Sequence, residues 1–132
     1  KDNERLEFLG DAVLKLIMSE YLYVTYPEKS EGMMTKIRSK VISDKILSQL
    51  AMYINLGKYI RFSHGEKRSG GENRESNLAN VFEAMLGAIY LDHDYKTAKD
   101  VFLLCCIAMT TQKIPATKAI IFENVYLSTE IV

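Results

Sequence analysis

The chain lacks tryptophan, has only two prolines and two cysteines, and carries no net charge. Cys105 and Cys106 are adjacent, and neighbours on a helix point in different directions, so we expect buried thiols of a reducing compartment rather than a disulfide. The longest apolar run, residues 101–109, is too short to span a bilayer, and the sequence does not start with a signal-peptide pattern. Balanced charge argues against a general polyanion binder. We therefore expect a cytoplasmic protein without a membrane partner.

Apolar residues make up 48% of the 132 residues and recur mostly at helical spacing, which predicts one all-α domain with a hydrophobic core. Helices are expected over residues 4–26, 33–41, 43–56, 76–92 and 95–110. Pro27 should end the first helix. The expected caps of the later helices are Ser43, Ser76 or Asn77, and Asp94. Between them, residues 58–75 predict a basic connection that contains glycines.

Acidic side chains occur in two short motifs. Glu4, Glu7 and Asp11 are spaced three and four residues apart, which puts them on one face of a helix. Asn80 and Glu83 lie three apart in a segment that is otherwise almost wholly apolar. Carboxylates that face one another from two helices suit a hard divalent cation and are costly in a core. Taken alone, Glu83 has the alternative of pairing with an arginine or facing a solvent gap.

The middle of the chain is basic. Residues 36–74 contain nine basic and three acidic side chains, a net charge of +6, which would suit a phosphodiester substrate. The alternative for the charge alone is an ordinary solvated helix face. Residues 65–71, GEKRSGG, could bring backbone N–H groups and cations to a phosphate, or could form an ordinary flexible loop.

Residues 3–14, NERLEFLGDAVL, resemble the signature motif of the ribonuclease III family. The family's other motifs follow in order: EG at 31–32, MTKIRSKVI at 34–42, GEKRSGG at 65–71, RES at 74–76 and LANVFEA at 78–84. The resemblance covers about residues 3–109. It implies an all-α, homodimeric endonuclease domain over residues 1–112, without the helix that precedes the signature in the family. Residues 113–132 are expected to form an atypical C-terminal tail.

The same resemblance implies a magnesium-dependent endonuclease, with Mn²⁺ as an alternative metal, that cleaves double-stranded RNA in rRNA or mRNA processing and leaves 5′-phosphate and 3′-hydroxyl ends. The implied metal positions are Glu7, Asp11, Asn80 and Glu83. Asp11 and Glu83, together with Glu4 and Glu31, would be the catalytic residues. The expected RNA-binding residues are Lys36, Arg38, Lys67, Arg68 and Arg74, and the dimer contact would include Phe8 and Leu9.

The sequence departs from the family at Asn80, where the family has an aspartate. Asparagine keeps a carbonyl oxygen but loses a negative charge, so we expect weaker metal binding and a large loss of turnover. Two explanations stay open: a substitution made to trap RNA on an inactive form, or a natural, degenerate member of the family. The alternative function is accordingly a non-catalytic relative that uses the dimeric fold to bind RNA or a ribonucleoprotein.

Overall fold

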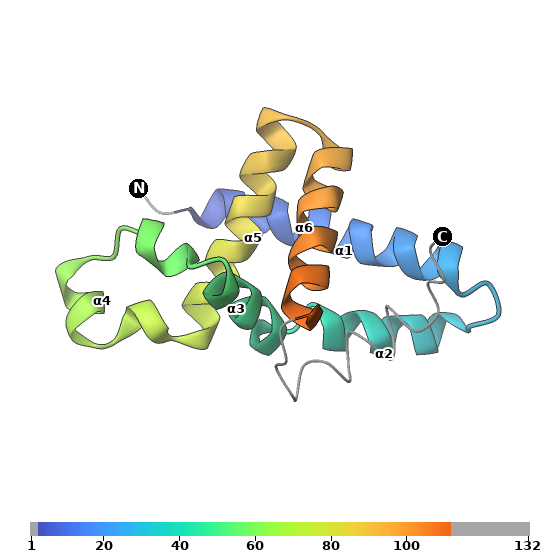
Figure 1. Cartoon of the computed structure of the whole chain (residues 1–132), viewed down its shortest axis with the longest axis horizontal. Coiled ribbons are helices and arrows are strands. Elements are labelled where there is room, and N and C mark those ends of the chain that lie inside the picture. The colour runs from blue at the N-terminus through green and yellow to red at the C-terminus, as the bar shows by residue number, and fades with distance from the viewer. Residues whose placement is uncertain (1–2, 112–132) are drawn as a thin grey trace.

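The computed structural model describes residues 3–111, and this part of the chain is helical with no strand (Figure 1). The all-α prediction is confirmed there, while the predicted tail lies outside the described residues. None of the described helices is both long and apolar enough to cross a membrane. The elements are α1 (Glu4–Thr25), α2 (Glu31–Val41), α3 (Asp44–Tyr53), η1 (Leu56–Tyr59), α4 (His64–Arg68), η2 (Gly71–Asn73), α5 (Glu75–Asp92) and α6 (Tyr95–Thr111).

The helix ends follow local capping chemistry. The Ser30 hydroxyl accepts a hydrogen bond from the backbone N–H of Met33, so α2 begins two residues earlier than expected. Asp94 accepts from the N–H of Thr97 at 2.7 Å, which confirms the predicted cap of α6. Helix α5 ends at Asp92 as expected, but its predicted cap was wrong, because the helix begins at Glu75 after Arg74, which makes no side-chain cap.

Two other expectations need correction. Ser43 does precede α3, but its hydroxyl donates to the Lys40 carbonyl and does not cap the helix. The helix ends at Tyr53 rather than near residue 56, because Asn55 adopts the left-handed conformation with φ of 53°. The expected connection over residues 58–75 contains α4 and η2, short helices that periodicity could not reveal.

Helix α5 lies at the centre and packs against α1, α3 and α6 (Figure 1). Its inner side chains, including Phe82 and Leu86, are fully buried. The Phe82 ring meets that of Phe102 on α6 edge to face, with centroids 6.3 Å apart. This core holds α1 and α5 against each other along the faces that carry the acidic motifs.

Helices α1 and α5 touch backbone to backbone at two glycines. A Cβ atom on Gly10 would lie 1.7 Å from the carbonyl oxygen of Glu83. A Cβ atom on Gly87 would lie 2.4 Å from the carbonyl oxygen of Leu6. No side chain fits at either position, so the two helices approach as closely as their backbones allow. The crossing places residues 7 and 11 of α1 next to residue 83 of α5.

Candidate functional site

An acidic cluster forms where α1 and α5 cross. Burial, followed by the charges of Asp11 and Glu7, raises the pKa of the partly buried Glu83 to about 7. The charge of Asp44, the first residue of α3, raises it further. The structure therefore brings the two predicted acidic motifs together. It also adds Asp44, which the sequence analysis did not include.

Glu7 shares this environment. Burial raises the pKa of Glu7 above its usual value, and the charges of Glu4, Asp11 and Asp44 raise it further. Carboxylates that repel one another in this way leave negative charge uncompensated. An oxygen-ligated divalent cation is the group that would compensate it.

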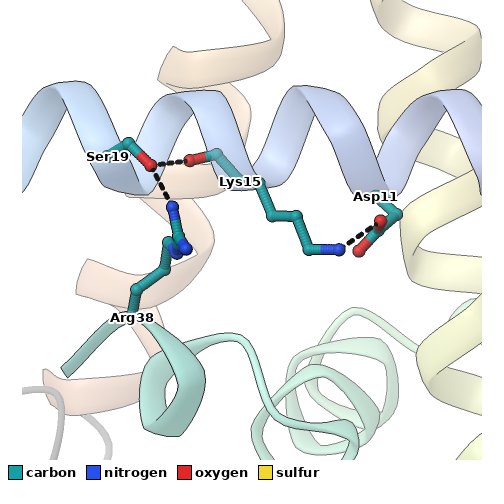
Figure 2. Close-up of polar contacts among 4 residues, drawn as sticks. All are labelled: Asp11, Lys15, Ser19 and Arg38. Atoms are coloured by element: carbon teal, nitrogen blue, oxygen red, sulfur yellow. Dashed lines mark hydrogen bonds and ion pairs between the residues drawn. The ribbon is translucent and has the colours of Figure 1, made fainter. Parts of the chain in front are cut away.

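Lys15 is a cation that pairs with one acid of this cluster. Its Nζ lies 2.6 Å from Oδ2 of Asp11, one turn earlier on α1, and the two side chains are 52% and 38% exposed (Figure 2). Lys15 is also the group whose charge lowers the pKa of Glu83 against the raising effects. Within residues 3–111, no three carboxylate, histidine or cysteine side chains converge into a ready-made metal site. The donor chemistry therefore fits a hard cation, but the side chains are not yet gathered around one point.

Asn80 lies one turn before Glu83 on α5 and is partly buried. It lines a surface cavity of about 270 Å³ together with Glu4, Glu7 and Arg61. The amide is thus beside the carboxylates that the family resemblance groups with it. Its assignment as a metal position stays a prediction.

Glu31 is the predicted site residue that lies apart from the cluster. It opens α2 and lines a different groove, about 400 Å³ in volume, between α1 and α2 with Leu16 and Met34. Its carboxylate accepts a hydrogen bond from the Thr35 hydroxyl at 3.1 Å. Within one chain the structure does not bring Glu31 to Glu4, because α2 runs beneath the opposite end of α1 (Figure 1).

The predicted RNA-binding residues fall into two groups. Lys67 and Arg68 end α4, Arg74 precedes α5, and all three are exposed. On α2, Lys36 is exposed, whereas Arg38 is partly buried and donates to the Ser19 hydroxyl at 2.7 Å (Figure 2). The roles of all five stay predictions, and Arg38 already has an internal partner.

The predicted dimer contact is at the surface. Phe8 is 81% exposed on α1, and it borders a shallow apolar depression with Leu6, Leu9 and Leu91. An exposed aromatic side chain of this size among leucines is typical of an interaction surface. Helix α1 therefore presents acids on one side and an apolar patch on another.

Gly10, Gly87, Lys15 and Asp44 are the important residues that the sequence analysis missed. Glycine is unfavourable in the interior of a helix, so its presence at both positions could have indicated a role in packing. The Asp11–Lys15 pair has the i, i+4 spacing of a helical ion pair, which the sequence shows directly. Asp44 gave no signal, because an acid in the first turn of a helix is ordinary.

The fold described above is similar to that of a solved nuclease domain. The nuclease domain of ribonuclease III from Campylobacter jejuni superposes with a TM-score of 0.77 and 39% sequence identity, over 79% of this chain and 73% of that one. That structure was described for flexibility in its region of dimer formation. A Ribonuclease-III-like family model matches residues 1–108. The chain belongs to the ribonuclease III family.

Two curated relatives match this chain over part of their length. Ribonuclease 3 of Carboxydothermus hydrogenoformans is 56% identical over 90 residues, which are 68% of this chain and 38% of that protein. Ribonuclease 3 of Pseudothermotoga lettingae is 48% identical over 103 residues, which are 78% of this chain and 43% of that protein. The chain thus spans less than half the length of these relatives.

Proposed function

We propose that this chain is the catalytic domain of an endonuclease that hydrolyses double-stranded RNA with divalent metal ions, Mg²⁺ or Mn²⁺. The observation that carries the proposal is the cluster of Glu7, Asp11 and Glu83 across the glycine contact of α1 and α5. Its uncompensated charge and its oxygen donors fit a hard cation. Membership of the ribonuclease III family supports the same reaction.

Each residue of the acidic cluster would have its own role in the reaction. Glu7, Asp11 and Glu83 would hold the metal, and the Asn80 carbonyl oxygen would face the same site. A bound divalent cation supplies a nucleophilic water at neutral pH and stabilises the leaving 3′-oxygen. Glu4 borders the cavity that Asn80 lines and adds negative charge beside Glu7. The products would carry 5′-phosphate and 3′-hydroxyl ends.

The exposed basic residues would hold the duplex. Lys67, Arg68 and Arg74 lie on the segment that precedes α5 and would contact phosphates. Double-stranded RNA presents shape, phosphates and 2′-hydroxyls rather than a readable base sequence, so binding would be largely independent of sequence. This fits a role in processing rRNA or mRNA precursors in the cytoplasm.

Asn80 favours a second candidate function. With one expected negative charge missing, the same dimeric fold could bind RNA or a ribonucleoprotein without cutting it. The two functions differ in whether restoring the charge restores cleavage.

Asn80→Asp should raise cleavage of a long RNA duplex in Mg²⁺ by about 10- to 100-fold, because one charged ligand governs both metal affinity and stabilisation of the reacting phosphate. The matched control is Asn73→Asp, which makes the same chemical change at an exposed residue of η2. Gel analysis of end-labelled duplex measures both variants beside the starting chain. A folded, dimeric Asn80→Asp variant that cuts nothing would overturn the enzyme proposal and favour the binding function.

We also propose that two copies of the chain pair through the Phe8 patch. Phe8→Asp should weaken the dimer by at least about 100-fold, because burying a phenylalanine contributes up to about 3 kcal/mol and a carboxylate cannot replace it there. Sedimentation velocity at micromolar concentration should show a dimer for the starting chain and a monomer for the variant. Tyr23→Asp, at a residue of α1 that is 76% exposed, should remain dimeric. A starting chain that sediments only as a monomer would contradict the proposal.

A further inference from the structure

The acidic cluster already contains a cation from the protein itself. We propose that Lys15 is the resident counter-ion of this site: its ammonium holds Asp11 until a divalent cation binds, then leaves Asp11, and so sets the affinity of the site for metal. This inference rests on the proposed metal-dependent function. It concerns a residue outside the set of predicted metal ligands.

A divalent cation and the Lys15 ammonium would repel each other if both bound the same oxygen of Asp11. The Lys15 Nζ lies 2.6 Å from Asp11 Oδ2. A magnesium ion would sit about 2.1 Å from the same oxygen, so the two positive charges would be no more than a few ångströms apart. Metal binding through this oxygen is therefore more favourable once the ammonium has moved away.

Lys15 acts on both helices of the site. It contacts Asp11 on α1, and its charge favours the ionised form of Glu83 on α5. Burial and the charges of neighbouring acids raise the pKa of Glu7 and of Glu83, so Lys15 offsets only part of the repulsion in the cluster. Within residues 3–111 the acids do not converge on a common point, and Asp11 is paired with Lys15 instead. Exchange of Lys15 for metal would free Asp11 to join the other acids.

Hydrogen bonds and close packing hold the backbone of α1 in place around Lys15, whereas the side chain of Lys15 can change its rotamer. The Ser19 hydroxyl donates to the Lys15 carbonyl oxygen at 2.6 Å and accepts from Arg38 of α2 (Figure 2). Five residues before Lys15, the close approach at Gly10 fixes α1 against α5. The Lys15 side chain is 52% exposed and can swing into water without disturbing the helix. The exchange therefore needs new side-chain rotamers and no change of fold.

The test is calorimetric titration of the whole chain with MnCl₂. Lys15→Met keeps the apolar stem and removes the charge, and it should tighten Mn²⁺ binding by about 3- to 10-fold because the competing cation is gone. The matched control is Lys45→Met, which removes the same charge beside Asp44, the acid that α3 adds to the cluster. It should change the affinity less than twofold.

The titrations are repeated in 0.5 M KCl, where the screening length falls to about 4 Å. If Lys15 acts through its direct contact with Asp11, Lys15→Met should still tighten Mn²⁺ binding at this salt concentration. An effect of long-range repulsion should disappear. In parallel, the ¹⁵N signal of the Lys15 ammonium should shift when Mg²⁺ is added to the starting chain. Circular dichroism checks that each variant remains helical.

The outcomes separate this inference from the proposed function. If the starting chain binds Mn²⁺ and Lys15→Met binds it equally or less tightly, the role of Lys15 is overturned and the metal site stands. If Lys45→Met tightens binding as much as Lys15→Met, general electrostatics explains the effect and the contact role is overturned. A starting chain that binds no Mn²⁺ at millimolar concentration overturns both proposals.

Discussion

Gly10→Ala should destabilise the domain by at least about 3 kcal/mol, because the added methyl group meets backbone and not a flexible side chain. Its Cβ would lie 1.7 Å from the Glu83 carbonyl oxygen and 3.1 Å from the backbone nitrogen of Gly87. Neither atom can move without separating α1 from α5. Domains of this size have total stabilities of about 5–15 kcal/mol, so this loss would remove a large share of the total.

Urea unfolding followed by circular dichroism measures this effect. Gly32→Ala is the matched control, because Gly32 also lies in a helix but a Cβ there would have nothing within 4 Å. That variant should be unchanged or more stable by up to about 1 kcal/mol, since alanine is the better helix former. If Gly10→Ala unfolds at the same urea concentration as the starting chain, the two helices do not cross as described.

Glu83→Gln should abolish cleavage yet stabilise the metal-free protein above neutral pH. The amide keeps the size of the side chain but removes the charge that would hold the metal, so activity should fall by at least about 100-fold. The same change removes the cost of burying the Glu83 charge and the repulsion that Asp11 and Glu7 exert on it. The proposed metal site is thus a source of instability when no cation is bound.

The direction of the pKa shift of Glu83 determines how the stability of the protein changes with pH. The pKa of Glu83 rises from 4.5 to about 7 on folding, so between these values the folded protein binds more protons than the unfolded chain. The stability of the metal-free protein therefore falls as pH rises from about 4.5 to about 7. The Glu83→Gln variant should not lose this stability, because glutamine does not ionise. Because water screens the partly exposed carboxylate, the gain at pH 8 should be about 1–2 kcal/mol, and it should vanish below about pH 4.5.

Two measurements check these statements. Urea unfolding at pH 4 and pH 8, in buffer with a chelator, should show the gain at the higher pH alone. Glu75→Gln, at an exposed residue of the same helix, should show no gain, because an acid in the first turn is favourable. Cleavage by Glu83→Gln at the starting rate would show that the metal site was wrongly assigned.

The sequence was sufficient to predict the fold class and the pairing of the two acidic motifs. Helical periodicity located α1, α2, α5 and α6 to within a few residues. Spacing put Glu4, Glu7 and Asp11 on one side of α1, and the apolar surroundings of Glu83 marked it as unusual. These predictions were possible because each depends on one helix and its immediate neighbours in the sequence.

The features that the sequence did not predict depend mostly on contacts between segments that are far apart in the chain. The contribution of Asp44 to the cluster needs α3 packed beside α5, which no local pattern shows. The contact of Gly10 with the backbone of Glu83 depends on how two helices cross. The position of Glu31 in a separate groove follows from the turn between α1 and α2, whose direction the sequence left open. Short helices such as α4 have too few turns for periodicity to reveal.

Helix α4 is stabilised by hydrogen bonds among its own residues, and this has a further consequence. The Ser63 hydroxyl accepts from the N–H of Glu66, and the Glu66 carboxylate accepts from the N–H of Ser63, so the helix carries its own capping box. No residue of α4 is buried in the core. The segment that presents Lys67 and Arg68 therefore keeps its helical form without support from the core, so substitutions on its surface should leave the core and the acidic cluster unchanged.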